Sequence, residues 1–145
     1  MIELTAKRIL DPELSEKLPD YGELLRILCF VKFKTSENWS QAYQGIVDTG
    51  AHTSVIPHSI WKGVEHETIG EHYVKGIVPE NRMPVKVGLL QCVLLDRKGN
   101  FSKPIKIRAF LAPADDIPLI MGFKDILENF EIRINLRNGS YLMEL

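Results

Sequence analysis

The sequence has few cysteines, and its opposite charges nearly cancel. Cys29 and Cys92 are the two cysteines among 145 residues, and both lie in apolar, strand-like stretches. A buried reduced thiol is the usual state there, so we expect neither a disulfide nor cysteine chemistry. Lysine plus arginine number 18 and aspartate plus glutamate number 19, scattered along the chain. We therefore expect no basic face for a phosphate backbone and no nucleic-acid partner.

Long apolar runs are also lacking. The best candidates, Ile105–Leu111 and residues 117–121, are short or interrupted, whereas a membrane-spanning helix needs about 20 apolar residues. Residues 1–18 are charged throughout and show neither the apolar core nor the small-residue cleavage site of a signal peptide. These absences predict a soluble, cytoplasmic protein without a membrane partner.

Motifs for metals, cofactors and nucleophilic catalysis are missing as well. The four histidines, at positions 52, 58, 66 and 72, do not have a zinc-ligand spacing such as H-E-x-x-H. The sequence has no glycine-rich phosphate loop and no Ser-His-Asp or Cys-His motif in a recognisable context. We expect no metal site and no cofactor.

What the chain does have is apolar alternation with a period of two, interrupted by turn residues. Its length fits one domain with a real core, and the alternation predicts an all-β or β-dominated fold. A helical turn is expected after Pro57 and a short helix over residues 123–129, while Asp11 could cap a short helix that begins at Pro12. The expected strands cover residues 25–34, 42–48, 52–56, 71–78, 83–95, 104–111, 117–121, 131–136 and 140–145.

The most informative run is IVDTGA at residues 46–51. Two β-branched apolar residues lead directly into Asp48, which predicts a carboxylate on a tight turn at the end of a buried strand. Alone, Asp-Thr-Gly is more often an ordinary turn, because all three residues are favoured in turns for reasons unrelated to chemistry. Other features of the sequence are needed to distinguish a structural carboxylate from a catalytic one.

With two later features, this run resembles the catalytic turn of the retropepsin-like (clan AA) aspartic proteases, which include retroviral proteases and bacterial single-domain relatives. The run LIMG at residues 119–122, followed by a short helical stretch, is similar to the apolar-apolar-glycine motif that packs behind that turn. The expected hairpin around residues 76–87 occupies the place of the flap. The resemblance covers residues 25–145 and implies a β-dominated closed barrel with one short C-terminal helix. Residues 1–24 would be an N-terminal extension.

The resemblance implies an aspartic endopeptidase that acts on polypeptides. Its chemistry needs one carboxylate to deprotonate a water and a second, protonated one to donate to the carbonyl oxygen. The chain has a single Asp-Thr-Gly, so the implied active form is a symmetric homodimer to which each chain contributes Asp48. Thr49 would hydrogen-bond across the dimer axis, Gly50 would place an amide near the carboxylate, and Ala51 would keep the floor of the cleft small.

Two further groups of residues receive roles from the resemblance. The second motif, Ile120, Met121 and Gly122, would support the catalytic turn. The flap would cover an extended substrate strand, and its expected substrate-binding residues are Gly76, Ile77, Val78, Pro79 and Glu80. The alternative for this hairpin is a plain surface hairpin without substrate contacts. The C-terminal strand would pair with its counterpart in the partner or close the sheet of its own chain.

The sequence departs from the family pattern at three places. Phe123 stands where an arginine is common, so a polar contact is missing or rerouted. His52 follows the motif alanine, where small or short polar residues are usual, and the flap region lacks paired glycines. The altered flap and Phe123 favour a catalytically inactive retropepsin-like module that binds peptides or dimerises, whereas the intact Asp48 favours the enzyme. An unrelated β-barrel that binds a small ligand is a third alternative.

Overall fold

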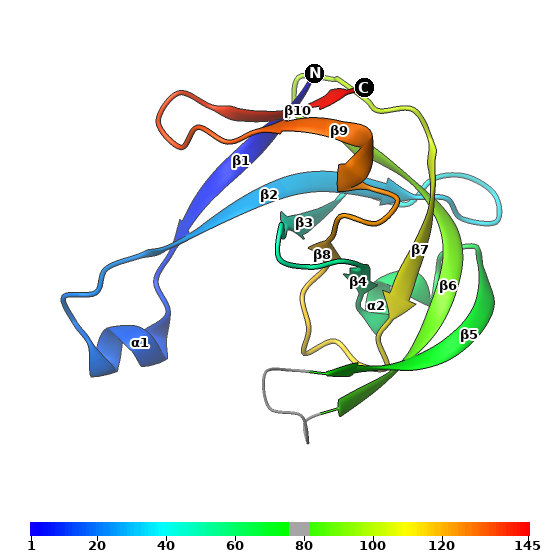
Figure 1. The fold of residues 1–145 in the computed structure, drawn as a ribbon, viewed down its shortest axis with the longest axis horizontal. Helices are drawn as coiled ribbons and strands as arrows, with labels where there is room; N and C mark the ends of the chain where they lie inside the picture. Colours follow the sequence, from blue (N-terminus) through cyan, green and yellow to red (C-terminus); the bar gives the residue numbers. More distant parts are fainter. Residues whose placement is uncertain (76–81) are drawn as a thin grey trace.

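The computed structural model describes residues 1–75 and 82–145, and these residues form a β-dominated fold, as the apolar alternation predicted (Figure 1). The strands and helices, in chain order, are β1 (Ile2–Ile9), α1 (Pro12–Lys17), β2 (Leu24–Phe33), β3 (Tyr43–Val47), β4 (Ser54–Ile56), α2 (His58–Trp61), β5 (His66–Lys75), β6 (Arg82–Leu95), β7 (Ile105–Leu111), β8 (Ile120–Met121), the 3-10 helix η1 (Leu127–Asn129), β9 (Phe130–Arg133) and β10 (Ser140–Glu144).

The strands close into a ring around the core. β6 pairs with β7 and also with β2, so the ring runs through β6, β7, β4, β8, β3 and β2 and returns to β6. In β7, Ile107, Ala109 and Leu111 are at most 1% exposed, while the residues between them are exposed or half-buried. Alternate side chains of a strand point to opposite faces, so one face of β7 lines the core. The same period allowed most of the strands to be predicted from sequence.

Several elements are shorter than the sequence predicted, and for two of them the physical reason is clear. The strand expected over residues 117–121 is β8, only Ile120–Met121, because Pro118 has no N–H to donate to a sheet. The helix expected over residues 123–129 is a turn followed by η1. Asp125 has a φ of 63°, and this left-handed conformation cannot continue a right-handed helix.

The N-terminal segment joins the main sheet. Ile2 and Leu4 in β1 are core residues, 2% and 5% exposed, and β1 pairs with both β2 and β10. The predicted short helix is present as α1, where the Asp11 side chain accepts a hydrogen bond from Leu14 N at 3.0 Å. The division of the chain into residues 1–24 and 25–145 stays a prediction.

The C-terminal strand pairs within its own chain. β10 lies between β1 and β9 and is hydrogen-bonded to both, which is one of the two arrangements that the sequence left open. β1 pairs with residues 140–142 and β9 with residues 141–144, so both edges of β10 are occupied at Tyr141 and Leu142.

The predicted hairpin is formed by β5 and β6, which pair from His66↔Leu90 to Lys75↔Arg82. The expected flap residues at its end, 76–80, lie outside the described residues. Within the described part of the chain, no helix is long and apolar enough to cross a membrane.

Candidate active site

Asp48 follows β3 directly, at the point where three strands of the ring meet. β8 lies between β3 and β4, with Val47 paired in parallel to Met121 and Val55 paired antiparallel to Ile120. Both ends of the turn that contains Asp48 are therefore fixed to the same short strand. The sequence predicted this turn and the second motif separately, and the fold brings the two together.

The Asp48 carboxylate is held by its own turn. Gly50 N donates to Asp48 Oδ1 at 2.8 Å, and Asp48 N donates to the carbonyl oxygen of Met121 at 3.0 Å. A Cβ added at Gly50 would lie 3.2 Å from Asp48 Oδ1, so the absence of a side chain eases this close approach. Asp48 is half-buried and Thr49 is exposed. The carboxylate is thus oriented by the backbone while one side of the turn stays open.

Gly122 packs directly against the back of the turn. Its amide donates to Ser54 Oγ at 2.9 Å, and both groups are buried. A Cβ added at Gly122 would lie 2.8 Å from the carbonyl oxygen of Ala51 and 2.9 Å from the carbonyl carbon of Thr53. Real side chains do not tolerate such distances to backbone, so a glycine is required here.

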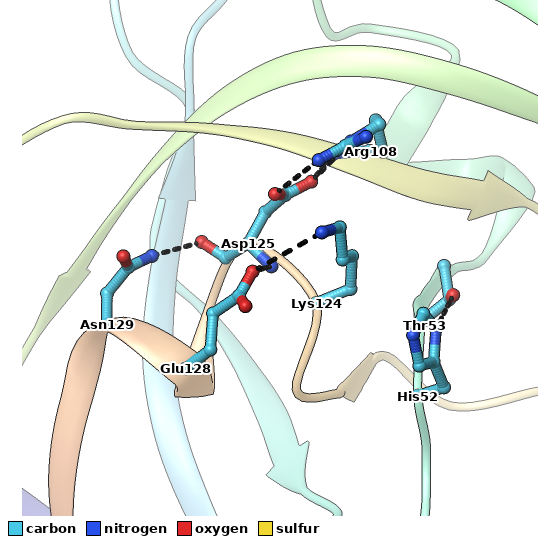
Figure 2. Close-up of polar contacts among 7 residues, drawn as sticks. All are labelled: His52, Thr53, Arg108, Lys124, Asp125, Glu128 and Asn129. Atoms are coloured by element: carbon cyan, nitrogen blue, oxygen red, sulfur yellow. Dashed lines mark hydrogen bonds and ion pairs between the residues drawn. The ribbon is translucent and has the colours of Figure 1, made fainter.

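The residues after Gly122 continue this backbone contact. Phe123 N donates to the carbonyl oxygen of Ala51 at 3.0 Å, and Lys124 N donates to that of His52 at 2.7 Å. The side chain of His52 is exposed, and its Nδ1 lies 3.0 Å from Thr53 Oγ1 (Figure 2). His52 therefore contributes its carbonyl oxygen to the contacts behind the turn, while its side chain points to solvent.

An ion pair fixes the turn that follows Gly122 (Figure 2). Arg108 Nε and Nη2 donate to Asp125 Oδ2 and Oδ1, both at 2.9 Å, and Arg108 N donates to Oδ2 at the same distance. The side-chain hydrogen bond from Arg108 is the largest influence on Asp125 and, against partial burial, lowers the pKa of its carboxyl group. Asp125 N in turn donates to Glu128 Oε1, and Asn129 Nδ2 donates to the carbonyl oxygen of Asp125.

Sequence reasoning missed Ser54, Arg108 and Asp125. The polar contact expected after Gly122 is rerouted: Phe123 is 40% exposed, and an arginine 17 residues earlier than Asp125 in the chain supplies the charge. No local pattern links β7 to this turn, so the sequence held no signal for the pairing.

Other acids have partners of their own. Asp96 accepts hydrogen bonds from Glu3 N, Lys98 N and both Asn100 N and Nδ2, at 2.8–3.0 Å. Burial raises its pKa, but these hydrogen bonds outweigh burial and lower it to about 2. Asp115 accepts from Ser59 N at 2.6 Å, which lowers its pKa. Asp96, Asp115 and Asp125 thus make structural hydrogen bonds.

An apolar hollow lies along the hairpin, in the half nearer to Lys75 and Arg82, and does not include Asp48. Its volume is about 500 Å³, and it is lined by Trp61, Glu71, His72, Tyr73, Pro84, Val85, Lys86, Leu111 and Pro113. Over residues 1–75 and 82–145, no group of three or more His, Cys, Asp or Glu side chains is placed to hold a metal ion.

Of the comparisons with known proteins, only the one with solved structures found matches. No protein-family model matches the sequence, and no curated protein does. Among solved structures, a retropepsin-like aspartic protease from Rickettsia conorii is similar over 98% of this chain and 93% of its own, with a TM-score of 0.51 and 15% identity. EIAV protease complexed with the inhibitor HBY-793 covers 71% of this chain and 86% of its own, with a TM-score of 0.46 and 23% identity. The Rickettsia structure shows that this chain has the retropepsin-like fold.

Proposed function

We propose that this protein is an aspartic endopeptidase whose active form is a homodimer, with Asp48 from each chain forming the catalytic pair. One observation carries the proposal. In a retropepsin-like fold, the Asp48 carboxylate projects from a partly open turn whose back is fixed by Gly122 and Ser54. A single chain offers one such carboxylate, and the chemistry needs two.

The reaction follows from the two carboxyl groups. Two carboxylates that share a site cannot both ionise cheaply, so the pair holds one proton and titrates as a unit. The ionised group takes a proton from a water, whose oxygen attacks the peptide carbonyl carbon, while the protonated group donates to the carbonyl oxygen. Collapse of the tetrahedral intermediate then breaks the C–N bond, and a proton passes to the leaving nitrogen. No metal or cofactor takes part.

The other predicted residues act around this pair. Thr49 hydrogen-bonds across the two-fold axis, Gly50 orients the carboxylate, and Ala51 keeps the cleft floor small. Ile120, Met121 and Gly122 hold the turn from behind. The polypeptide substrate binds as an extended strand beneath the hairpin formed by β5 and β6, and residues 76–80 are its covering segment.

A second candidate function is a peptide-binding or dimerisation module without turnover. The hydrogen bond from Gly50 N to Asp48 Oδ1 is compatible with it, because an ordinary strand-ending turn makes the same contact. Phe123 in place of an arginine points in the same direction. Both candidates share the fold and the dimer, so only the chemistry separates them.

The deciding experiment compares the wild type with Asp48→Asn on an unstructured protein substrate from acidic to neutral pH. Asp48→Asn keeps the shape of the side chain and removes its charge, so the rate of cleavage should fall by roughly 10³-fold or more. Pepstatin-like inhibitors should block cleavage by the wild type. Asp116→Asn, an exposed acid in the loop before β8, is the matched control and should retain full activity. Equal cleavage by the wild type and Asp48→Asn would contradict the proposal that this protein is an aspartic protease. Peptide binding without cleavage by the wild type would support the binding module.

A further inference from the structure

A second hollow lies on the outer face of the ring, over β2 and β6. These two strands lie side by side, with Lys32 opposite Val93 (Figure 1). In β2, Val31 and Phe33 are buried in the core. Successive side chains of a strand point to opposite faces, so Lys32, between these two residues, points out of the ring. Lys32 and Val93 both line the hollow.

The lining of this outer hollow is mainly aromatic and apolar. Its volume is about 420 Å³. Trp39 and Asn38 line it from the loop after β2, and Phe101 and Pro104 line it from the segment between β6 and β7. Phe101 is 61% exposed. A concave surface that combines apolar side chains with a few polar groups is typical of binding sites.

Hydrogen bonds fix both sides of the outer hollow. In the loop after β2, Thr35 Oγ1 donates to the carbonyl oxygen of Asn38 at 2.9 Å and accepts from Asn38 N at 3.0 Å. On the other side, the buried Ser102 accepts from Leu94 N at 2.9 Å, and its own amide donates to the carbonyl oxygen of Leu94 at 2.8 Å. A ligand would not have to order these segments, which lowers the entropic cost of binding.

Three lysines surround the outer hollow: Lys32, Lys34 and Lys103. Lys34 Nζ lies 5.9 Å from the centroid of the Trp39 ring, and Lys103 stands between two residues that line the hollow. Within the described part of the chain, none of the three forms an ion pair, and no described aspartate or glutamate lines the hollow. Glu144 accepts from the amide of Lys103 at 3.2 Å. The ammonium groups thus favour an anionic ligand.

This combination fits an acidic polypeptide segment better than a nucleic acid. One large apolar side chain of such a segment can enter the hollow while its carboxylates meet the lysines. The side chain of Asn38 is exposed, and an amide can both donate to and accept from a peptide backbone. Binding of single-stranded nucleic acid needs a positively charged groove that follows the phosphates. Three lysines around one hollow, in a chain with a formal net charge of -1, do not form such a groove.

The outer hollow lies away from Asp48. β2 and β3 are antiparallel, with Leu28 opposite Ile46, and continuing this register brings Arg26 level with Asp48. Lys32 is six residues further along β2 (26 to 32), a distance of about 20 Å at roughly 3.3 Å per residue. A polypeptide with one bond at Asp48 needs at least about six more extended residues to reach the hollow.

We propose that the outer hollow is a docking site for an acidic segment of a polypeptide, with one large apolar side chain against the two aromatic rings and its carboxylates near the three lysines. The role of this docking rests on the proposed function, since the same polypeptide would place its scissile bond at Asp48. The docking site adds a preference for substrates that carry an acidic segment some distance from the cleaved bond.

The first test measures binding to the full-length protein by fluorescence anisotropy. The probe is a fluorescein-labelled peptide of glutamates around one phenylalanine. Lys32→Glu combined with Lys103→Glu should raise its dissociation constant at least ~10-fold, because two attractive charges become repulsive. Lys7→Glu combined with Arg137→Glu makes the same charge change at exposed positions outside the hollow, and this control should bind the peptide as the wild type does.

A second variant tests the aromatic lining. Phe101→Asn should also raise the dissociation constant at least ~10-fold, because the apolar side chain of the peptide loses one of its aromatic contacts. Leu18→Asn is the matched control, because Leu18 is similarly exposed at 53% but does not line the hollow. Circular dichroism should show that every variant is folded.

Changes in the probe test the chemistry of the ligand. A peptide with glutamines in place of the glutamates, and one with alanine in place of the phenylalanine, should each bind at least ~10-fold more weakly. High salt should weaken binding of the acidic peptide. A labelled single-stranded oligonucleotide should bind more weakly than the acidic peptide at the same salt concentration.

A cleavage assay tests the role of the docking site in substrate choice. Two unstructured substrates share one cleavage sequence, and only one of them also carries the acidic segment. The wild type should have the lower KM for that substrate. Lys32→Glu combined with Lys103→Glu should remove this difference in KM and leave kcat unchanged, because docking away from the scissile bond stabilises the bound substrate and the transition state equally.

The outcomes separate docking from catalysis. If the wild type does not bind the acidic peptide, or if the lysine variant binds it equally well, the inference is overturned even when the wild type cleaves substrate. Tighter binding of the oligonucleotide than of the peptide also overturns it. If the variants of the hollow weaken peptide binding but the wild type cleaves no substrate, the docking site stands and the proposed protease activity fails.

Discussion

The amide of Gly122 donates to the hydroxyl oxygen of Ser54 at 2.9 Å, across a sequence separation of 68 residues. This buried hydrogen bond joins β4, the strand after the Asp48 turn, to the second motif behind the turn. Ser54 is 1% exposed, so water cannot replace it as the acceptor. A Cβ at Gly122 would clash with the backbone of Ala51 and Thr53, so the Asp48 turn packs closely against this glycine.

The first prediction concerns the Ser54 hydroxyl. Ser54→Ala leaves the Gly122 N–H buried without a partner, which should lower the free energy of unfolding by roughly 1–3 kcal/mol. For a chain of this size that corresponds to a fall in Tm of several degrees. Ser36→Ala, at an exposed loop position, should leave Tm unchanged in the same calorimetric measurement. An unchanged Tm for Ser54→Ala would show that the hydrogen bond does not stabilise the site.

Gly122→Ala should harm cleavage more than it harms stability. The new Cβ would meet the backbone of Ala51 at 2.8 Å, and the turn that bears Asp48 must shift to make room. Overpacking of this kind costs about 1–3 kcal/mol, while a displaced carboxylate should reduce kcat by roughly 10²-fold. Gly63→Ala is the control, since nothing lies within 4 Å of its added Cβ. Full activity in Gly122→Ala would mean that the turn is not fixed from behind.

Local patterns in the sequence were enough to predict the turn that contains Asp48 and the second motif behind it. Asp48 and Gly122 each follow a short apolar strand, and a strand followed by a turn is encoded within a few neighbouring residues. The fold class and most strands were predictable for the same reason. The predicted roles of the site residues themselves stay predictions.

Contacts between distant residues could not be predicted in this way. Nothing in the residues around Ser54 indicates that it will accept a hydrogen bond from Gly122. Likewise, nothing in the sequence of β7 indicates that Arg108 will pair with Asp125. β1 was also missed. Ile2 and Leu4 alternate like a strand, but the charged residues that follow conceal the pattern, and its pairing with β2 and β10 depends on the assembled sheet.

The ion pair of Arg108 and Asp125 should affect cleavage with little effect on stability. The Arg108 side chain is 50% exposed, and exposed ion pairs contribute little to folding. Arg108→Gln should nevertheless lower kcat/KM by roughly two- to five-fold, because the pair orients the turn whose amides donate to Ala51 and His52. Arg108→Lys should recover only part of this loss, since a lysine cannot donate to both carboxylate oxygens in parallel. Lys106→Gln, exposed on the same strand, is the control. Identical kcat/KM values for all of these proteins would contradict the proposal that the ion pair orients this turn.

Asp96 should control the stability of the fold in acid. Its pKa in the folded state is about 2, below the ordinary value of 3.8 for an aspartate, so the folded state favours the ionised carboxylate. Stability from this group is complete above about pH 4 and is lost as the pH falls through about 2, because protonation then disrupts the hydrogen bonds to Glu3, Lys98 and Asn100.

The variant that tests this is Asp96→Asn. At neutral pH its stability should be lowered as that of the wild type is lowered in acid. An amide can accept fewer of the hydrogen bonds that hold β1 to the turn after β6, so the free energy of unfolding should fall by roughly 1–3 kcal/mol at pH 7. The difference between the two proteins should shrink between about pH 4 and 2, where the wild type loses the same contribution. Urea unfolding at a series of pH values, followed by tryptophan fluorescence, measures it. A constant difference across that range would show that Asp96 is not the group that titrates.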